Sequence, residues 1–340
     1  MIRVAAFMMI LAAASAITAA DAPPTVDSAV TRGLIFLARQ QNRDGSFGAD
    51  QSRLLATSRA LLVFLQAGNV PDLGRYGFAV RGAQGWILES VLPNGGFAGS
   101  DGRTRAQAAA VLALAESYGV ETSADRRNRI LSALRLEVGT VLTAQLPAQG
   151  SARADGGGWS DEKNAPASLQ ITAIAVMALS SAHDVGVAAP AAAFDQARRF
   201  ILACNATPGG GFGEEPGKPP TVDATAAALL ALDVLSPGGD DTERVNATAA
   251  TYLDSQAASA GSMGFTAGAW LCWCDARLEL PAAVKIRDAY VQRLVGAQDK
   301  EGAWRVASKS EATTAGRLAV TELSLLGLTA RFRSPPILRH

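Results

Sequence analysis

The chain has 340 residues, of which 49% are hydrophobic and 6% aromatic, and its formal net charge at pH 7 is zero. Balanced charge excludes binding modes that depend on a basic surface, and we therefore expect no nucleic-acid partner. The length allows a large buried core, and the abundance of alanine and leucine over aromatic residues favours helices over strands.

The first 22 residues have the pattern of a secretory signal peptide. Arg3 supplies a positive charge, residues 4–17 are apolar, and small residues follow up to Ala20 and Ala22, where we expect cleavage. The alternative, an uncleaved membrane anchor, is disfavoured by the short apolar core. We therefore expect an exported bacterial protein, periplasmic or extracellular, that does not span the membrane after cleavage.

Helices of two kinds alternate along the remaining chain. The predicted helix over 25–41 has one polar and one apolar face, whereas the helix over 52–67 is apolar nearly all round. The same pairing recurs at 77–92 with 104–118, 124–145 with 167–182, 190–204 with 221–235, 241–258 with 266–280, and 282–298 with 311–331. Amphipathic helices suit an outer layer, and fully apolar helices suit burial between two layers.

A glycine followed by an aromatic residue marks the turn within each helix pair. The first and last copies read Q-x-x-x-G-x-aromatic, and the four between them are weaker. Glycine permits the positive φ of a sharp reversal, the aromatic ring can cover a helix end, and the glutamine can bond backbone groups left open there. The residues of this structural motif are Gln41, Gly45, Phe47, Phe97, Trp159, Phe212, Phe265, Gln298, Gly302 and Trp304.

Six such pairs form an irregular but persistent repeat. An open superhelix would leave the apolar helices half exposed, so the pattern predicts closure into an all-α (α/α)6 barrel, or toroid. We place this domain at residues 23–331 and a C-terminal tail at 332–340.

The turn motif resembles the QW repeat of squalene-hopene and oxidosqualene cyclases, and the same toroid occurs in the β subunits of protein prenyltransferases. The resemblance covers about residues 25–331. Gly157-Gly158-Trp159 followed by 176–179 (V-M-A-L) is similar to a pattern in exported bacterial proteins described as prenyltransferase and squalene oxidase repeat proteins. The resemblance implies a central cavity with an apolar ligand, such as an isoprenoid.

The catalytic motifs of these families are missing. No D-x-D-D acid motif of the cyclases is present, and the two histidines, His183 and His340, are not placed for the zinc site of the prenyltransferases. We therefore expect no metal, no cofactor and no terpene chemistry. The three cysteines (Cys204, Cys272 and Cys274) suit a buried core better than a disulfide framework.

Candidate ligand residues come from aligning the apolar helices. Three of these helices carry a pair of polar residues near the start, where they would ring one mouth of the barrel, and two tryptophans could line the cavity. The candidates are Arg105, Gln107, Gln170, Thr172, Asp223, Thr225, Trp270 and Trp273. Helix capping and solvent contact are the alternative for the polar residues, and ordinary core packing is the alternative for the tryptophans.

Three functions remain open from the sequence. The first is a secreted toroid that binds an apolar small molecule in its cavity. The second is a cyclase-like or carbohydrate-active enzyme that uses rim carboxylates, with Asp223 as the candidate acid and Glu311 or Asp161 as its partner. The third is an interaction module that docks a protein of the cell envelope.

Overall fold

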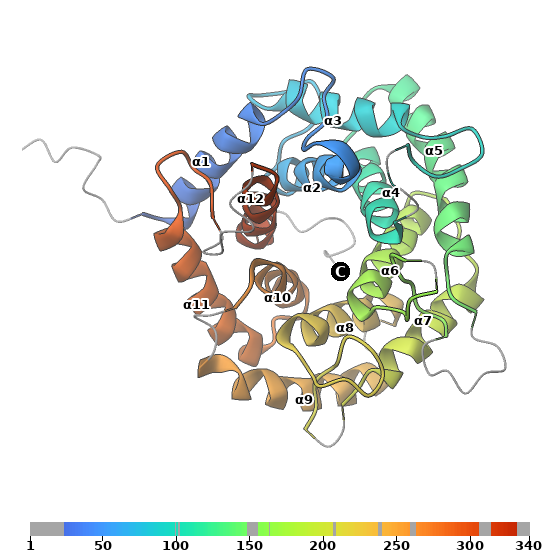
Figure 1. Cartoon of the computed structure of the whole chain (residues 1–340), viewed down its shortest axis with the longest axis vertical. Coiled ribbons are helices and arrows are strands. Elements are labelled where there is room, and N and C mark those ends of the chain that lie inside the picture. Colours follow the sequence, from blue (N-terminus) through green and yellow to red (C-terminus); the bar gives the residue numbers. More distant parts are fainter. Residues whose placement is uncertain are drawn as a thin grey trace, which may run out of the picture.

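The computed structural model is a closed double ring of helices (Figure 1). The structure describes residues 24–98, 100, 103–147, 156–162, 164–206, 209–236, 240–258, 263–305 and 314–331. The predicted leader at 1–22 and tail at 332–340 lie outside these residues, as does Glu311. No helix within the described ranges is both long and apolar enough to cross a bilayer.

The two rings are made by helices that alternate along the chain. The outer helices are α1 (Val26–Arg39), α3 (Gly77–Glu89), α5 (Ala124–Thr143), α7 (Ala191–Ala203), α9 (Asp240–Ser255) and α11 (Pro281–Ala297). The inner helices are α2 (Arg53–Gln66), α4 (Thr104–Tyr118), α6 (Leu169–Asp184), α8 (Val222–Leu235), α10 (Phe265–Leu278) and α12 (Thr314–Thr329). Each inner helix packs against the next, and α12 packs against α2, which closes the ring. The predicted toroid of six helix pairs is confirmed.

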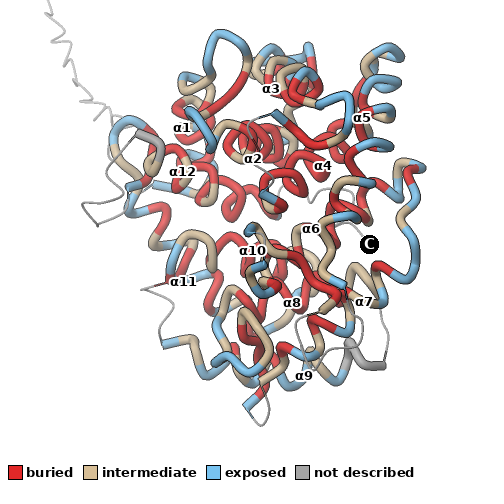
Figure 2. Tube along the Cα trace, turned by 45° about the vertical axis from the view of Figure 1, so that its right-hand side comes forward, coloured by how far each residue is buried: buried red, intermediate tan, exposed pale blue. Residues whose placement is uncertain are grey.

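The residue types of each helix explain whether it lies in the inner or the outer ring. Every residue of α4 from Ala106 to Ser117 is buried, and its many alanines let neighbouring inner helices approach closely. A leucine such as Leu112, with no exposed surface, contributes roughly 1.5–3 kcal/mol by its burial. In α1 the buried residues lie on one face, as Leu34 and Leu37 do. Burial is concentrated on the inner ring and on the inward faces of the outer one (Figure 2).

The turns need glycine for two reasons. Gly45 has a φ of 90° and Gly302 a φ of 91°, which is the left-handed region that other residues avoid. A β-carbon on Gly45 would also collide with the carbonyl oxygen of Gly82, and one on Gly302 with that of Arg32. Both collisions are with the next outer helix, so these turns pack directly against the following repeat.

Where the motif glutamine is present, it ties its repeat to the next. Nε2 of Gln41 donates to the carbonyl oxygens of Gly45 and Ala79, both at 2.9 Å. Nε2 of Gln298 donates to the carbonyl oxygens of Gly302 at 2.9 Å and Ala29 at 2.8 Å. Since Ala29 lies in α1, the second of these bonds joins the last repeat to the first.

A third glutamine makes the same bonds and is missed by the sequence analysis. Nε2 of Gln145 donates to the carbonyl oxygens of Gly157 at 2.7 Å and of Ala193 in α7 at 2.9 Å. An insertion separates Gln145 from its glycine and hides the motif spacing. Bonding of open backbone groups was expected, whereas the reach into the neighbouring repeat is a finding of the structure.

The aromatic residue of the turn is buried in five of the six repeats. Phe47, Phe97, Trp159, Phe212 and Trp304 are each at most 2% exposed. Phe265 differs because it is already the first residue of α10 and is only partly buried. In that repeat no loop separates the aromatic residue from the inner helix.

The three cysteines are free and buried, as the sequence predicts. Burial raises the pKa of Cys204 and of Cys272 to about 12. Both thiols therefore stay protonated near neutral pH, and they act as small core residues.

Candidate functional site

A threonine in the N-terminal half of four inner helices sets a common register. Its hydroxyl oxygen accepts a hydrogen bond from the backbone N–H of the turn aromatic at 2.9–3.2 Å. The four threonines are Thr57, Thr172, Thr225 and Thr321. Each of them faces its turn, so residues two positions earlier on the same helices face the opposite way, toward the axis of the barrel.

A cavity lies on that axis. It holds about 570 Å³ of empty space, counting space open to solvent. The centres of water molecules can occupy about 50 Å³ of it, room for roughly three to five waters. Its lining residues recur at steps of four and three: Leu55, Arg59 and Leu62 of α2, Arg105 and Ala109 of α4, Gln170 and Ile174 of α6, Thr266, Ala269, Trp270 and Trp273 of α10, and Leu323 and Leu326 of α12.

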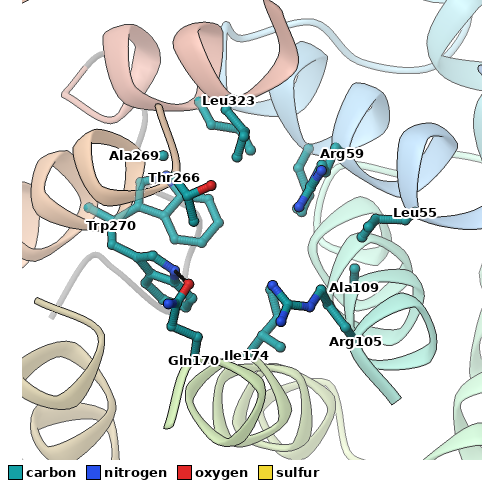
Figure 3. A pocket seen from close by; sticks show the side chains of 13 residues that line it. Leu55, Arg59, Arg105, Ala109, Gln170, Ile174, Thr266, Ala269, Trp270 and Leu323 are labelled. Carbon is teal, nitrogen blue, oxygen red and sulfur yellow. Dashed lines mark hydrogen bonds between the residues drawn. The ribbon is translucent and has the colours of Figure 1, made fainter. Parts of the chain in front are cut away.

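The cavity has a cationic side and an aromatic side. Arg59 and Arg105 reach in from α2 and α4, and Trp270 faces them from α10 (Figure 3). The rings of Trp270 and Trp273 meet edge to face, with centroids 5.8 Å apart. Such pairs are favourable beyond the area they bury, so the aromatic side is held in place.

Gln170 joins three inner helices at the mouth. Its Nε2 donates to Oδ2 of Asp223 at 2.9 Å and to Oε2 of Glu214 at 3.1 Å. Its Oε1 accepts a hydrogen bond from Nε1 of Trp270 at 3.2 Å. This network fixes the Trp270 ring and uses one oxygen of each carboxylate.

The acids at the mouth have partners at the starts of inner helices. Oε1 of Glu214 accepts hydrogen bonds from the Ser168 hydroxyl and from the backbone N–H of Gln170 at the start of α6. The carboxylate of Asp161 accepts from the backbone N–H of Arg105 at 2.7 Å and from its Nε at 3.1 Å. A carboxylate at a helix N-terminus is favourable, so these acids stabilise α6 and α4.

Arg59 and Glu322 have no such partners. Among the described residues Arg59 makes no hydrogen bond or ion pair, and burial lowers its pKa. Glu322 of α12 has no exposed surface, and neither carboxylate oxygen has a hydrogen-bond partner. Burial raises the pKa of Glu322 well above 4.5, while the nearby charge of Arg59 opposes this rise. The protonated form of Glu322 is therefore favoured.

Neither Arg59 nor Glu322 is predicted from the sequence as a site residue, although a signal is present. Each is the one charged residue in a largely apolar inner-helix segment, 54–65 or 318–328. A charge in such a segment is costly to bury unless it has a partner or a role.

The structure separates the predicted site residues into two groups. Arg105, Gln170, Trp270 and Trp273 line the cavity, and Asp223 lies beside them through its bond to Gln170. The other three face the turns. Thr172 and Thr225 are buried and bonded to the aromatic N–H groups, and Gln107 lines a hollow formed by the Gly95 turn and α5. Residues two apart on a helix point about 200° apart, so each predicted pair is split between the two faces.

Two of the predicted rim acids already have side-chain partners. Asp223 is bonded to Gln170, and Asp161 to Arg105. Within the described ranges, no cluster of three or more His, Cys, Asp or Glu side chains is placed to hold a metal ion.

Comparison with known proteins identifies the domain. The family model for the prenyltransferase alpha-alpha toroid domain matches residues 3–127 and 171–269. No curated protein matches the sequence.

Solved structures with the same fold differ widely in sequence. A protein from Actinoplanes is 18% identical, with a TM-score of 0.60, over 90% of this chain and 99% of its own. The type II terpene cyclase MstE from Scytonema, solved with geranylgeranyl dihydroxybenzoate, is 13% identical, with a TM-score of 0.57, over 92% of this chain and 98% of its own. An α-1,6-mannanase of Salegentibacter, solved with α-1,6-mannotriose, is 9% identical, with a TM-score of 0.55, over 90% of this chain and 99% of its own. At these identities the likeness concerns the fold alone.

Proposed function

Because the chain belongs to the prenyltransferase alpha-alpha toroid domain family, we propose that it binds a slender apolar molecule, such as an isoprenoid, in its central cavity. The observation that carries this proposal is the wall of the cavity. Trp270, Trp273 and several aliphatic side chains surround a space that is also lined by a few polar residues. Ligand sites are typically apolar pockets with a small number of placed polar groups.

The size of the cavity limits the size of the ligand. The space open to water centres, about 50 Å³, suits a small apolar molecule. A ligand that covers the two indole rings removes apolar surface from water, worth roughly 25 cal/mol per Å².

Binding without terpene chemistry fits the residues better than catalysis at the rim. Each of Asp161, Glu214 and Asp223 is already bonded to an arginine or a glutamine. An acid that protonates an alkene or a glycosidic oxygen has to face its substrate in the protonated form. The rim carboxylates instead stabilise helix starts and the position of Gln170.

Blocking the cavity tests this function. N-Phenyl-1-naphthylamine is a neutral apolar dye whose fluorescence rises on leaving water. We expect the wild-type protein to bind it, and Ala109→Phe, which fills the cavity from α4, to abolish the signal. Trp86→Ala, on the outer helix α3, removes a tryptophan away from the cavity and serves as the control. Equal dye binding by wild type and Ala109→Phe, or none by wild type, would contradict the proposal.

We also propose that the protein is exported, on the strength of the pattern in residues 1–22. The full-length chain is to be expressed in a Gram-negative bacterium, followed by fractionation and intact-mass measurement. A periplasmic or secreted product that begins at residue 21 or 23 supports export. An unprocessed cytoplasmic product contradicts it.

A further inference from the structure

We propose that the ligand carries one negative charge, as a fatty or isoprenoid carboxylic acid does, and that Arg59 binds the carboxylate. The inference deepens the proposed function and rests on it. In this arrangement the hydrocarbon chain lies deeper in the cavity, against Trp273, Leu62 and Leu326, and the charged group lies nearer the mouth.

The first support is the state of the two arginines. Arg105 gives its Nε to Asp161, with which it forms an ion pair at 3.1 Å. Arg59 has five N–H donors and no hydrogen-bonding partner in the described part of the chain, although it faces the same cavity. Arg59 is half-buried at the cavity, and an anionic acceptor supplied by a ligand forms charge-assisted hydrogen bonds with its free donors, which are stronger than bonds between neutral groups.

The second support is that Glu322, the acid that interacts electrostatically with Arg59, makes no hydrogen bond with it. Both oxygens of Glu322 are buried and have no hydrogen-bond partner among the described residues, so its carboxyl group does not accept from the guanidinium. Burial also favours the protonated form of this acid, which lessens the negative charge that it offers to Arg59.

The aromatic side offers no free donor to a charged group. Nε1 of Trp270 is bonded to Gln170. Nε1 of Trp273 is buried, so this residue meets the cavity through its ring. A carboxylate in the cavity therefore finds its free donor at Arg59 rather than on the aromatic side.

The depth of these groups sets the orientation of the ligand. Leu55, Arg59 and Leu62 lie on one face of α2 at steps of four and three residues, so Arg59 is one turn below the mouth and Leu62 one turn deeper. Trp273 and Leu326 line the cavity beside Leu62. The deep end is therefore apolar, and an amphiphile fits tail first.

The charges at the mouth favour one negative charge over several. Asp161, Glu214 and Asp223 are three carboxylates near the entrance, and Arg105 is the arginine that partners one of them. Two of the acids already occupy the starts of α4 and α6, where a phosphate would otherwise bind. A diphosphate would face repulsion there, whereas a single carboxylate is balanced by Arg59.

Two ligands that share a hydrocarbon chain but differ in charge separate the contribution of the carboxylate to affinity from that of the chain. cis-Parinaric acid and its methyl ester share one fluorescent hydrocarbon chain and differ in the carboxylate. We expect the wild-type protein to bind the acid at least tenfold more tightly than the ester. In Arg59→Gln we expect the affinity for the acid to fall at least tenfold, with the affinity for the ester unchanged. Arg81→Gln, which alters an exposed arginine on α3, is expected to match wild type.

Two further measurements distinguish a failure of the charge proposal from a failure of the proposed function. Arg59→Lys is expected to restore most of the preference for the acid, and Arg59→Gln is expected to bind N-phenyl-1-naphthylamine as wild type does. Equal binding of acid and ester by wild type overturns the charge proposal, and so does stronger competition by farnesyl diphosphate than by farnesoic acid. Failure of the neutral dye to bind wild type overturns the proposed function itself.

Discussion

The turns and the central cavity are built by opposite faces of the same inner helices, and they use polar groups in opposite ways. In the turns, Gln298 and Thr321 make bonds that recur from repeat to repeat. Arg59 lines the cavity and Glu322 is buried near it; neither has a hydrogen bond in the described structure, and neither recurs. The face with recurring bonds holds the ring together, and the face that varies lines the cavity in which we propose that a ligand binds.

Gly302 provides the strongest test of the turn face. We expect Gly302→Ala to lower the free energy of unfolding by about 3 kcal/mol or more, because a β-carbon there meets the carbonyl oxygen of Arg32 at a φ of 91°. Urea denaturation followed by circular dichroism measures this change. The matched control is Gly296→Ala in α11, where nothing lies near a β-carbon, and there we expect no loss. Equal effects at the two glycines would refute the role of the turn.

The second turn, at residues 91–97, differs from the other turns because it includes a buried carboxylate. It has Val91 where the first, third and last turns have glutamine, and a buried carboxylate from α5 takes part in this turn. Oε2 of Glu137 accepts a hydrogen bond from the backbone N–H of Gly96 at 3.1 Å, and Oε1 has no partner. Burial raises the pKa of Glu137 to about 7, against an ordinary value of 4.5.

Stability is therefore expected to depend on pH through Glu137. The pKa of Glu137 is higher in the folded state than in the unfolded state, so the folded protein binds the proton of this carboxyl more tightly. The resulting contribution to the free energy of unfolding is complete below pH 4.5 and is lost as the pH rises through 7. We expect Glu137→Gln to unfold at the same temperature as wild type at pH 4.5 and to be more stable at pH 8, by up to about 3 kcal/mol. Thermal unfolding at both pH values checks this, and the same difference at both would contradict it.

Ring closure is expected to depend on Gln298. Gln298→Ala removes the bonds to Gly302 and Ala29, and each lost bond to a carbonyl costs about 1 kcal/mol. We expect a loss of about 2 kcal/mol in the free energy of unfolding. Hydrogen exchange is expected to quicken in α1 and α11 and to stay unchanged in α5. Uniform acceleration over the whole chain would argue against a local closing role.

Substitutions of Thr225 and Asp223 compare the contributions to stability of the turn face and the cavity face of one helix, α8. Thr225→Val leaves the backbone N–H of Phe212 without its acceptor, and we expect this to cost about 1–3 kcal/mol. Asp223→Asn keeps a group that can accept from Gln170, and we expect a change below about 0.5 kcal/mol. Chemical denaturation of both variants measures the contrast. A larger loss in Asp223→Asn would reverse the assignment of the two faces.

The fold could be predicted from the sequence because its determinants are local. Helical periodicity, the alternation of amphipathic and apolar helices, and the glycine-aromatic turns each lie within a short window. Gln145 escaped notice because an insertion breaks that window. Alignment of the sequence places Thr172 and Thr225 at the mouth because it shows equivalent positions but not which face of the helix each one occupies.

The cavity could be predicted only in part. Arg105, Gln170 and the two tryptophans were identified, whereas Arg59 and Glu322 were not, since their lack of partners depends on helices far apart in the sequence. The predicted leader and the place of export depend on residues outside the described structure, so they remain predictions.

Native mass spectrometry of the protein with cis-parinaric acid tests the central claim most directly. We expect wild type to hold one ligand molecule, and Ala109→Phe to hold none while it unfolds at a similar temperature. A one-to-one complex in both proteins, or in neither, would contradict binding in the central cavity.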